Sequence, residues 1–125
     1  MSETVRLLIV DDDPQFRKLV RLVLRRARDF EFVGEAHDGH TGVEQTELLR
    51  PDVVLLDLMM PGMDGFEALP KIQAAHPQVS VVVLTALDAD QVEEGVLFGA
   101  AGFVEKQHVT DHLETVIRNC TWHAI

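Results

Sequence analysis

The chain has 125 residues and a formal net charge of -10, with 46% apolar and 26% charged residues, which predicts one folded domain rather than a disordered segment. The acidic excess argues against nucleic-acid binding by this domain, because phosphate contacts need a basic surface. A lone cysteine, Cys120, the lack of a basic-then-apolar leader and the lack of any apolar run near ~18 residues favour a cytoplasmic protein without a membrane span.

Apolar strand-like runs alternate with helix-like segments along the whole chain. Asp13 followed by Pro14 predicts the first helix start, because aspartate caps helices and proline suits the first helical position. Asp38, Asp64 and Asp88 stand at the starts of the next three helices. The predicted strands are residues 5–10, 31–36, 52–57, 79–84 and 101–105; the predicted helices begin at 14, cover about 40–49 and 64–75, run from Asp88 to Gly99, and cover 109–120.

This alternation predicts an α/β protein with a five-stranded parallel sheet. The first, third and fourth strands are near-continuous aliphatic runs, as expected when helices cover both faces of the sheet. The common arrangement of such units is the doubly wound, flavodoxin-like (βα)5 fold with strand order 2-1-3-4-5. Its ligands bind at the carboxyl ends of the strands, where the order reverses between the first and third strands.

Two residues disturb the predicted helices. Pro70 lies inside the helix at 64–75, where it removes a backbone hydrogen bond, so that helix either bends near residue 66 or starts late. Gly95 lies inside the helix that starts at Asp88 and costs about 1 kcal/mol relative to alanine. We therefore expect the segment around Gly95 to be the least stable part of the output surface to which this helix contributes, as suits a switch surface.

Acidic side chains follow two of the predicted strands at their carboxyl ends. Asp11, Asp12 and Asp13 follow the first strand, and Asp57 ends the third. Neighbouring strands lie about 4.8 Å apart, so Asp11, Asp12 and Asp57 should converge, whereas Asp13 is better explained as the helix cap. Clustered carboxylates repel one another unless a cation neutralises them, and oxygen ligands favour magnesium. The sequence therefore predicts a Mg²⁺ site.

Lysine and hydroxyl groups end the next two strands. Lys106 starts about 10 Å from Asp57, a gap that a lysine side chain can largely cover, and Thr85 starts one strand away. A carboxylate can attack phosphorus to form an aspartyl phosphate, while a metal and a lysine spread the charge of the transferring group. This pattern indicates that Asp57 accepts a phosphoryl group. The Pro61-Gly62 turn could bring the Met59 carbonyl to the metal.

The motifs together resemble a response-regulator receiver domain of two-component signalling. They are LLIVDDD at 7–13, PDVVLLDLMMPGMDG at 51–65, VVVLTA at 81–86 and GAAGFVEK at 99–106. The resemblance covers essentially the whole chain. The motif sequences are most similar to those of regulators that carry a C-terminal helix-turn-helix domain. We expect a single receiver domain over residues 1–125, either standing alone or forming the N-terminal part of a longer regulator.

The resemblance implies a role for each matching residue, and a switch rather than a metabolic enzyme. The implied roles are phosphoacceptor for Asp57, direct magnesium ligand for Asp12, water-mediated ligand for Asp11, carbonyl ligand for Met59, phosphate contact for Thr85, Ala86 and Lys106, and switch aromatic for Phe103. The implied donor is a phosphohistidine on a histidine kinase or phosphotransfer protein. The implied output is a face made by the fourth helix, fifth strand and fifth helix, which binds a partner, an attached domain or a second copy.

Several points stay open at this level. Many family members carry proline where this chain has Gln107, so the Lys106-Gln107 peptide is expected to be trans, or cis under strain. Phe103 is either a switch residue or plain core. Six of the eleven basic residues lie between positions 17 and 28, either as a solvated helix face or as a docking surface for an acidic phosphodonor.

Two other functions compete with the phosphorylated switch. A magnesium-dependent phosphatase with an aspartyl intermediate would use a pair such as Asp11 and Asp13, but 125 residues leave no room for a cap domain. A pseudo-receiver that acts only through binding usually lacks an acidic residue of the site, and failure to bind magnesium would favour it.

Overall fold

The sheet and its covering helices are seen in a computed structural model that describes residues 4–87 and 99–121. The strands are β1 (Val5–Val10), β2 (Phe30–Ala36), β3 (Val53–Asp57), β4 (Ser80–Thr85) and β5 (Gly102–Glu105). The helices are α1 (Pro14–Leu24), α2 (Gly39–Leu49), α3 (Gly65–Ala75) and α5 (Val109–Thr121), with a short 3₁₀ turn, η2, at Lys106–His108.

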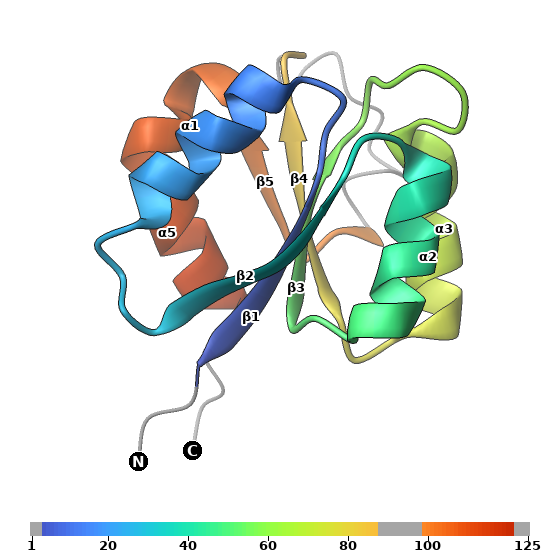
Figure 1. Ribbon diagram of the computed structural model, residues 1–125, viewed down its shortest axis with the longest axis horizontal. Coiled ribbons are helices and arrows are strands. Elements are labelled where there is room, and N and C mark those ends of the chain that lie inside the picture. Colours follow the sequence, from blue (N-terminus) through green and yellow to red (C-terminus); the bar gives the residue numbers. More distant parts are fainter. Residues whose placement is uncertain (1–3, 88–98, 122–125) are drawn as a thin grey trace.

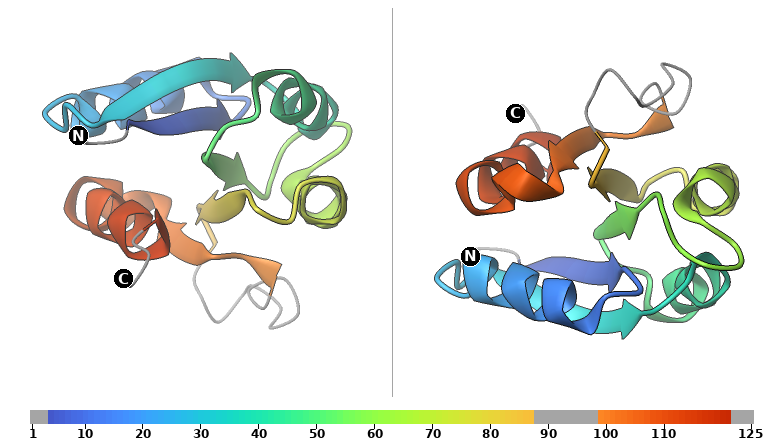
Figure 2. Two further views of the ribbon diagram at one scale, coloured as in Figure 1. Left: turned by 90° about the horizontal axis from the view of Figure 1, so that it is seen from below. Right: turned by 90° about the horizontal axis from the view of Figure 1, so that it is seen from above.

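All five strands are parallel and lie in the order β2-β1-β3-β4-β5, which confirms the predicted doubly wound sheet. Figures 1 and 2 show α1 and α5 on one face of the sheet and α2 and α3 on the other. β1 pairs with both β2 and β3, so the strand order reverses at β1. The carboxyl ends of β1 and β3 therefore meet at the edge where ligands bind in such sheets.

Alternate residues of the central strands fill two apolar layers. One layer packs strand side chains such as Leu8 and Leu56 against Leu69 and Ile72 of α3. The other packs neighbouring strand residues such as Ile9 against α1 and α5. The last four residues of β1, Leu7–Val10, and all of β3 are buried, which explains their aliphatic runs and fixes the position of the residues that follow each strand.

Helix caps lie where the sequence predicted them. The Asp13, Asp38 and Asp64 side chains each accept a backbone N–H from the first turn of α1, α2 and α3. Of the two alternatives for the helix containing Pro70, the late start is wrong, because α3 begins at Gly65, capped by Asp64, and continues through Pro70; the bend near residue 66 stays a prediction. Pro70 is exposed, so its ring does not disturb the buried side of α3.

Most observed ends of strands and helices either agree with the predicted ends or differ from them by one residue. β4 ends at Thr85 rather than at residue 84, which makes Thr85 the last residue of the strand. The helix predicted from Asp88, with Gly95 inside it, lies outside the described residues except at its end. None of the helices in the described ranges has the length and apolar character that crossing a lipid bilayer requires.

Candidate functional site

Three carboxylates meet at the carboxyl edge of β1 and β3. Each of Asp11, Asp12 and Asp57 offers an oxygen, and these atoms all lie within 4.8 Å of one another. Asp11 and Asp57 are buried, with 0% and 3% exposure, whereas Asp12 is exposed to solvent. The convergence that the topology predicted is therefore confirmed. An all-oxygen donor set of this size suits a hard divalent cation such as Mg²⁺.

Backbone and side-chain hydrogen bonds hold Asp11 in place. Its N–H donates to the Ala36 carbonyl of β2 at 3.0 Å. Its Oδ1 accepts the Asp13 N–H at 2.8 Å, and Asp13 in turn accepts the Gln15 N–H at 2.9 Å to cap α1. Residues 11–13, which we call the acid loop, are thus held by hydrogen bonds to β2 on one side and to the start of α1 on the other.

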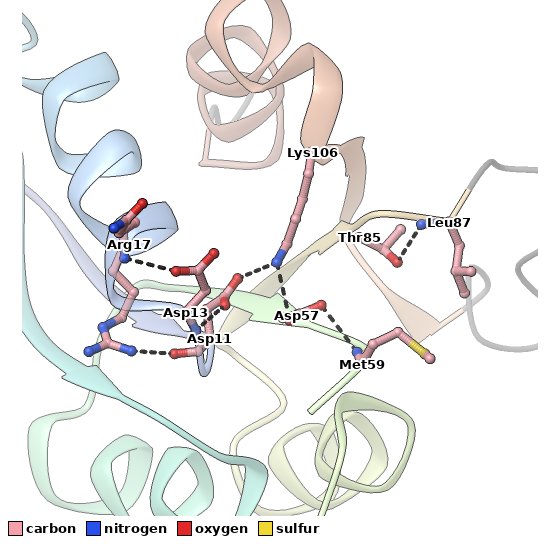
Figure 3. Close-up of polar contacts among 9 residues, drawn as sticks. Asp11, Asp13, Arg17, Asp57, Met59, Thr85, Leu87 and Lys106 are labelled. Carbon is pink, nitrogen blue, oxygen red and sulfur yellow. Dashed lines mark hydrogen bonds and ion pairs between the residues drawn. The ribbon is translucent and has the colours of Figure 1, made fainter. Parts of the chain in front are cut away.

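Lys106 places its ammonium between the two buried acids. Its Nζ lies 2.7 Å from Asp11 Oδ2 and 3.2 Å from Asp57 Oδ2, as Figure 3 shows. The same atom lies 4.3 Å from the centre of the Phe16 ring, which adds a cation–π contact from α1. The Lys106-Gln107 peptide is trans. The predicted approach of Lys106 is therefore achieved without a cis bond.

The three acids of the site carry more negative charge than the single ammonium of Lys106 can balance. The pKa of Asp57 is raised to about 6, and burial is the main cause. The Met59 N–H favours the charged form and lowers the pKa, the charge of Asp11 raises it, and Lys106 lowers it. Burial alone would lower the pKa of Lys106, but its hydrogen bond to Asp11 and the charges of Asp57 and Asp11 raise it instead. A divalent cation among these acids would favour the charged form of Asp57.

The loop after Asp57 folds back closely over the strand end. The Met59 N–H donates to Asp57 Oδ1 at 3.1 Å, and the Gly65 N–H donates to the Leu58 carbonyl at 3.1 Å. A Cβ atom at Gly65 would collide with the Asp57 carbonyl oxygen and lie 2.6 Å from the Leu58 Cα, so only glycine fits there. Gly62 has a φ of 73°, which glycine adopts without strain.

The remaining predicted residues lie on β5 or at the carboxyl end of β4. The Thr85 side chain is fully buried, and its Oγ1 accepts the Leu87 N–H at 3.1 Å. Ala86 is exposed directly after it. Phe103 pairs in register with Val83 of β4 and is partly buried against the α2–α3 layer. The structure thus brings Asp11, Asp12, Asp57, Lys106 and the Met59 backbone together, while the assigned roles of Thr85, Ala86 and Phe103 stay predictions.

Sequence reasoning missed two residues of α1 that touch this site. The Phe16 ring belongs to the apolar layer between α1 and the sheet, and it also faces the Lys106 ammonium. Arg17 was grouped with the basic cluster, yet its Nη1 donates to the Asp11 carbonyl at 2.6 Å and its Nε donates to Glu35 at 2.7 Å. Their only sequence signal is their place in the first turn of the helix that follows the acids.

The chain belongs to the response regulator receiver domain family. The sequence model of that family, described as "Response regulator receiver domain", matches residues 7–118. Among curated proteins, the chain is 37% identical over 106 residues to the nitrate/nitrite response regulator protein NarL of Escherichia coli K12, covering 84% of this chain and 49% of that protein. It is 36% identical over 110 residues to chemotaxis protein CheY of Listeria monocytogenes, covering 87% of this chain and 92% of CheY.

Solved structures agree with this assignment. The signal receiver domain of the putative response regulator NarL from Mycobacterium tuberculosis superposes with a TM-score of 0.79 at 30% identity, covering 98% of this chain and 100% of that one. The response regulator domain of Thermotoga maritima CheB gives 0.84 at 26% identity, covering 98% and 100%. The chain spans about half the length of several curated relatives, including NarL and the Bacillus subtilis regulator YxjL.

Proposed function

We propose that this chain is a phosphorylation-dependent signalling switch that accepts a phosphoryl group on Asp57. One observation carries the proposal: a buried carboxylate at a strand end stands beside two further acids, all within 4.8 Å, with a lysine ammonium 3.2 Å away. A structural carboxylate would be costly to bury among two other acids. A phosphoacceptor needs this environment, because a cation and an ammonium must both reach the transferring group.

Magnesium is the cofactor that suits the donor set. Asp12 and Asp57 would bind it directly, Asp11 would act through water, and the Met59 carbonyl would complete the protein ligands. The exposed position of Asp12 gives the ion access from solvent, while the burial of Asp11 and Asp57 strengthens their interaction with it. When bound, Mg²⁺ would neutralise charge on the phosphoryl oxygens.

The proposed reaction is a transfer from a phosphohistidine to a carboxylate. An oxygen of Asp57 attacks the phosphorus and forms an O–P bond, while the N–P bond breaks and leaves its electron pair on the imidazole. Lys106, already held near Asp57, pairs with the phosphoryl oxygens. Water later hydrolyses the acyl phosphate, so the chain resets itself and does not turn over a metabolic substrate.

The proposed donor is a histidine kinase or a phosphotransfer protein, and the proposed output lies on the face that includes β5 and α5. Thr85 and Phe103 would carry the change, since Thr85 ends β4 and Phe103 lies on the adjoining strand. Phosphorylation would draw Thr85 away from the Leu87 N–H and let Phe103 turn inward. The reshaped surface would bind a partner, an attached output domain or a second copy of the chain.

The hydrolase alternative has less support. A phosphatase of that type would need a second free aspartate two residues after its nucleophile. Asp13 occupies that position relative to Asp11, but its carboxylate caps α1 by accepting the Gln15 N–H. The pseudo-receiver alternative differs in its measurable behaviour, because it predicts neither magnesium binding nor a covalent product.

The test is intact mass spectrometry after incubation with a small-molecule phosphodonor and Mg²⁺. The expected result is one added phosphoryl group that disappears with EDTA and in the Asp57→Asn variant. A phosphohistidine donor protein is tried in parallel. Folded protein that accepts no phosphoryl group from either donor would refute the switch and favour the pseudo-receiver, whereas turnover on phosphate monoesters would favour the phosphatase.

A further inference from the structure

The guanidinium of Arg17 connects α1, β2 and the acid loop. Its Nη1 donates to the Asp11 carbonyl oxygen at 2.6 Å, and its Nε donates to Glu35 Oε1 at 2.7 Å. Figure 3 shows the side chain reaching from α1 under the loop to the Asp11 carbonyl, away from the carboxylates. Only 18% of the Arg17 side chain is exposed, and its contact with the Asp11 carbonyl is partly buried, whereas its contact with Glu35 lies at the surface.

The Asp11 carbonyl, which accepts this hydrogen bond, belongs to the peptide that joins the two acids Asp11 and Asp12 and so affects the orientation of both. The peptide group between Asp11 and Asp12 includes this carbonyl, so fixing it restricts rotation of both residues. The Asp11 N–H is already fixed by Ala36, and the Asp11 carboxylate by the Asp13 N–H. Asp12 is exposed, and its backbone position depends on the anchored carbonyl before it.

We propose that Arg17 is a positioning residue for the magnesium site, with Glu35 holding Arg17 in turn. This inference rests on the proposed function, since it assumes that Asp11 and Asp12 bind the metal. The planar guanidinium can serve the carbonyl and the carboxylate at once, which a lysine ammonium, as a single point donor, does less well. Groups that orient metal ligands typically change metal affinity by about 10–100-fold when mutated.

Arg21 provides a matched control one helical turn away. It also forms an ion pair with Glu35, through Nη1 and Oε2, and it too belongs to α1. Arg17 contacts the acid loop as well as Glu35, whereas Arg21 pairs with Glu35. Replacing either arginine by lysine keeps the net charge constant, so a difference between the two variants reports the contact to the Asp11 carbonyl rather than a change in the field.

The experiment compares magnesium affinity by isothermal titration calorimetry for the wild type, Arg17→Lys and Arg21→Lys. We expect the magnesium Kd to rise about 10-fold in Arg17→Lys and to change less than about twofold in Arg21→Lys. Phosphorylation measured against magnesium concentration should show a raised half-saturating concentration with a similar rate at saturation. Equal affinities in the two variants would overturn the inference, because a purely structural arginine would alter melting in EDTA without altering affinity.

Two other results, an Arg17→Lys variant that does not fold and a wild type that binds no magnesium, lead to different conclusions. If Arg17→Lys does not fold, Glu35→Gln keeps Arg17 but removes its charged anchor, and it should weaken magnesium binding more than Arg21→Lys does. Unchanged affinity in Glu35→Gln would then refute the role of Arg17. If the wild type itself binds no magnesium, the proposed function fails and the positioning role fails with it.

Discussion

Replacing Asp57 by asparagine should stabilise the metal-free protein at neutral pH. Burial raises the pKa of Asp57 to about 6 from an ordinary 3.8, so the folded state binds the proton more tightly than the unfolded chain. Ionised Asp57 therefore lowers the free energy of unfolding. This loss is absent below pH 3.8, grows between pH 3.8 and about 6, and is constant above that range. A shift of roughly two units corresponds to about 3 kcal/mol at the plateau.

The asparagine side chain recovers only part of this free energy. Its oxygen can still accept the Met59 N–H, but its amide nitrogen then faces the Lys106 Nζ, which lies 3.2 Å from Asp57 Oδ2 in the wild type. Two donors opposite each other forfeit about 1 kcal/mol. The net gain expected for Asp57→Asn at pH 7.5 is therefore about 1–2 kcal/mol.

Urea unfolding followed by circular dichroism in EDTA measures this gain. Glu31→Gln, an exposed acid on β2, controls for the general effect of lowering the net charge of -10. At pH 4 the gain should disappear, and Mg²⁺ at pH 7.5 should stabilise the wild type more than the variant. A variant that is less stable than the wild type at pH 7.5, or equally favoured at pH 4, would refute the electrostatic argument.

Four further substitutions probe the same site and the loop after Asp57. Lys106→Met leaves Asp11 and Asp57 buried without an ammonium and should cost about 3 kcal/mol of unfolding free energy in EDTA; no loss would contradict the ion pairing. Gly65→Ala should cost about 3 kcal/mol, because its Cβ would lie 2.6 Å from the Leu58 Cα, whereas Gly62→Ala should cost only about 1 kcal/mol of backbone strain; equal losses in urea unfolding would refute the close-packing argument. Phe16→Leu removes the aromatic face beside Lys106, so the pKa of Lys106 measured by NMR should fall, and an unchanged pKa would contradict the cation–π contact.

The sheet and the acid cluster were predictable because both follow from local patterns. The aliphatic runs before Asp11 and Asp57 determine two neighbouring parallel strands, and the topology then brings their carboxyl ends together. The caps at Asp13 and Asp64 were equally readable, since the capping contact spans only two or three residues. Lys106 was predictable for the same reason as Asp57, because it directly follows a strand.

The contacts made by Arg17 could not be read from sequence. Its partner Glu35 lies eighteen residues away on another element, and no periodic pattern marks an arginine that faces inward. The two alternatives for the basic cluster, a solvated face or a docking surface, both stay predictions; within the cluster, Arg17 and Arg21 each pair with Glu35. The Thr85 hydroxyl makes a contact of the same short span as the helix caps, because it accepts the Leu87 N–H two residues on, and this turn contact was not predicted.

The contacts of Arg17 leave the negative charge around Asp57 in place. Three carboxylates lie close together beside one lysine, and burial, followed by the charge of Asp11, raises the pKa of Asp57. The excess of negative charge over the single ammonium attracts a divalent cation. A second cation paired with these carboxylates would remove that excess and, with it, the affinity for a metal. Arg17 lies beside the site but directs its guanidinium to a backbone carbonyl and to Glu35. It can therefore fix the shape of the acid pair while its charge is balanced outside the site.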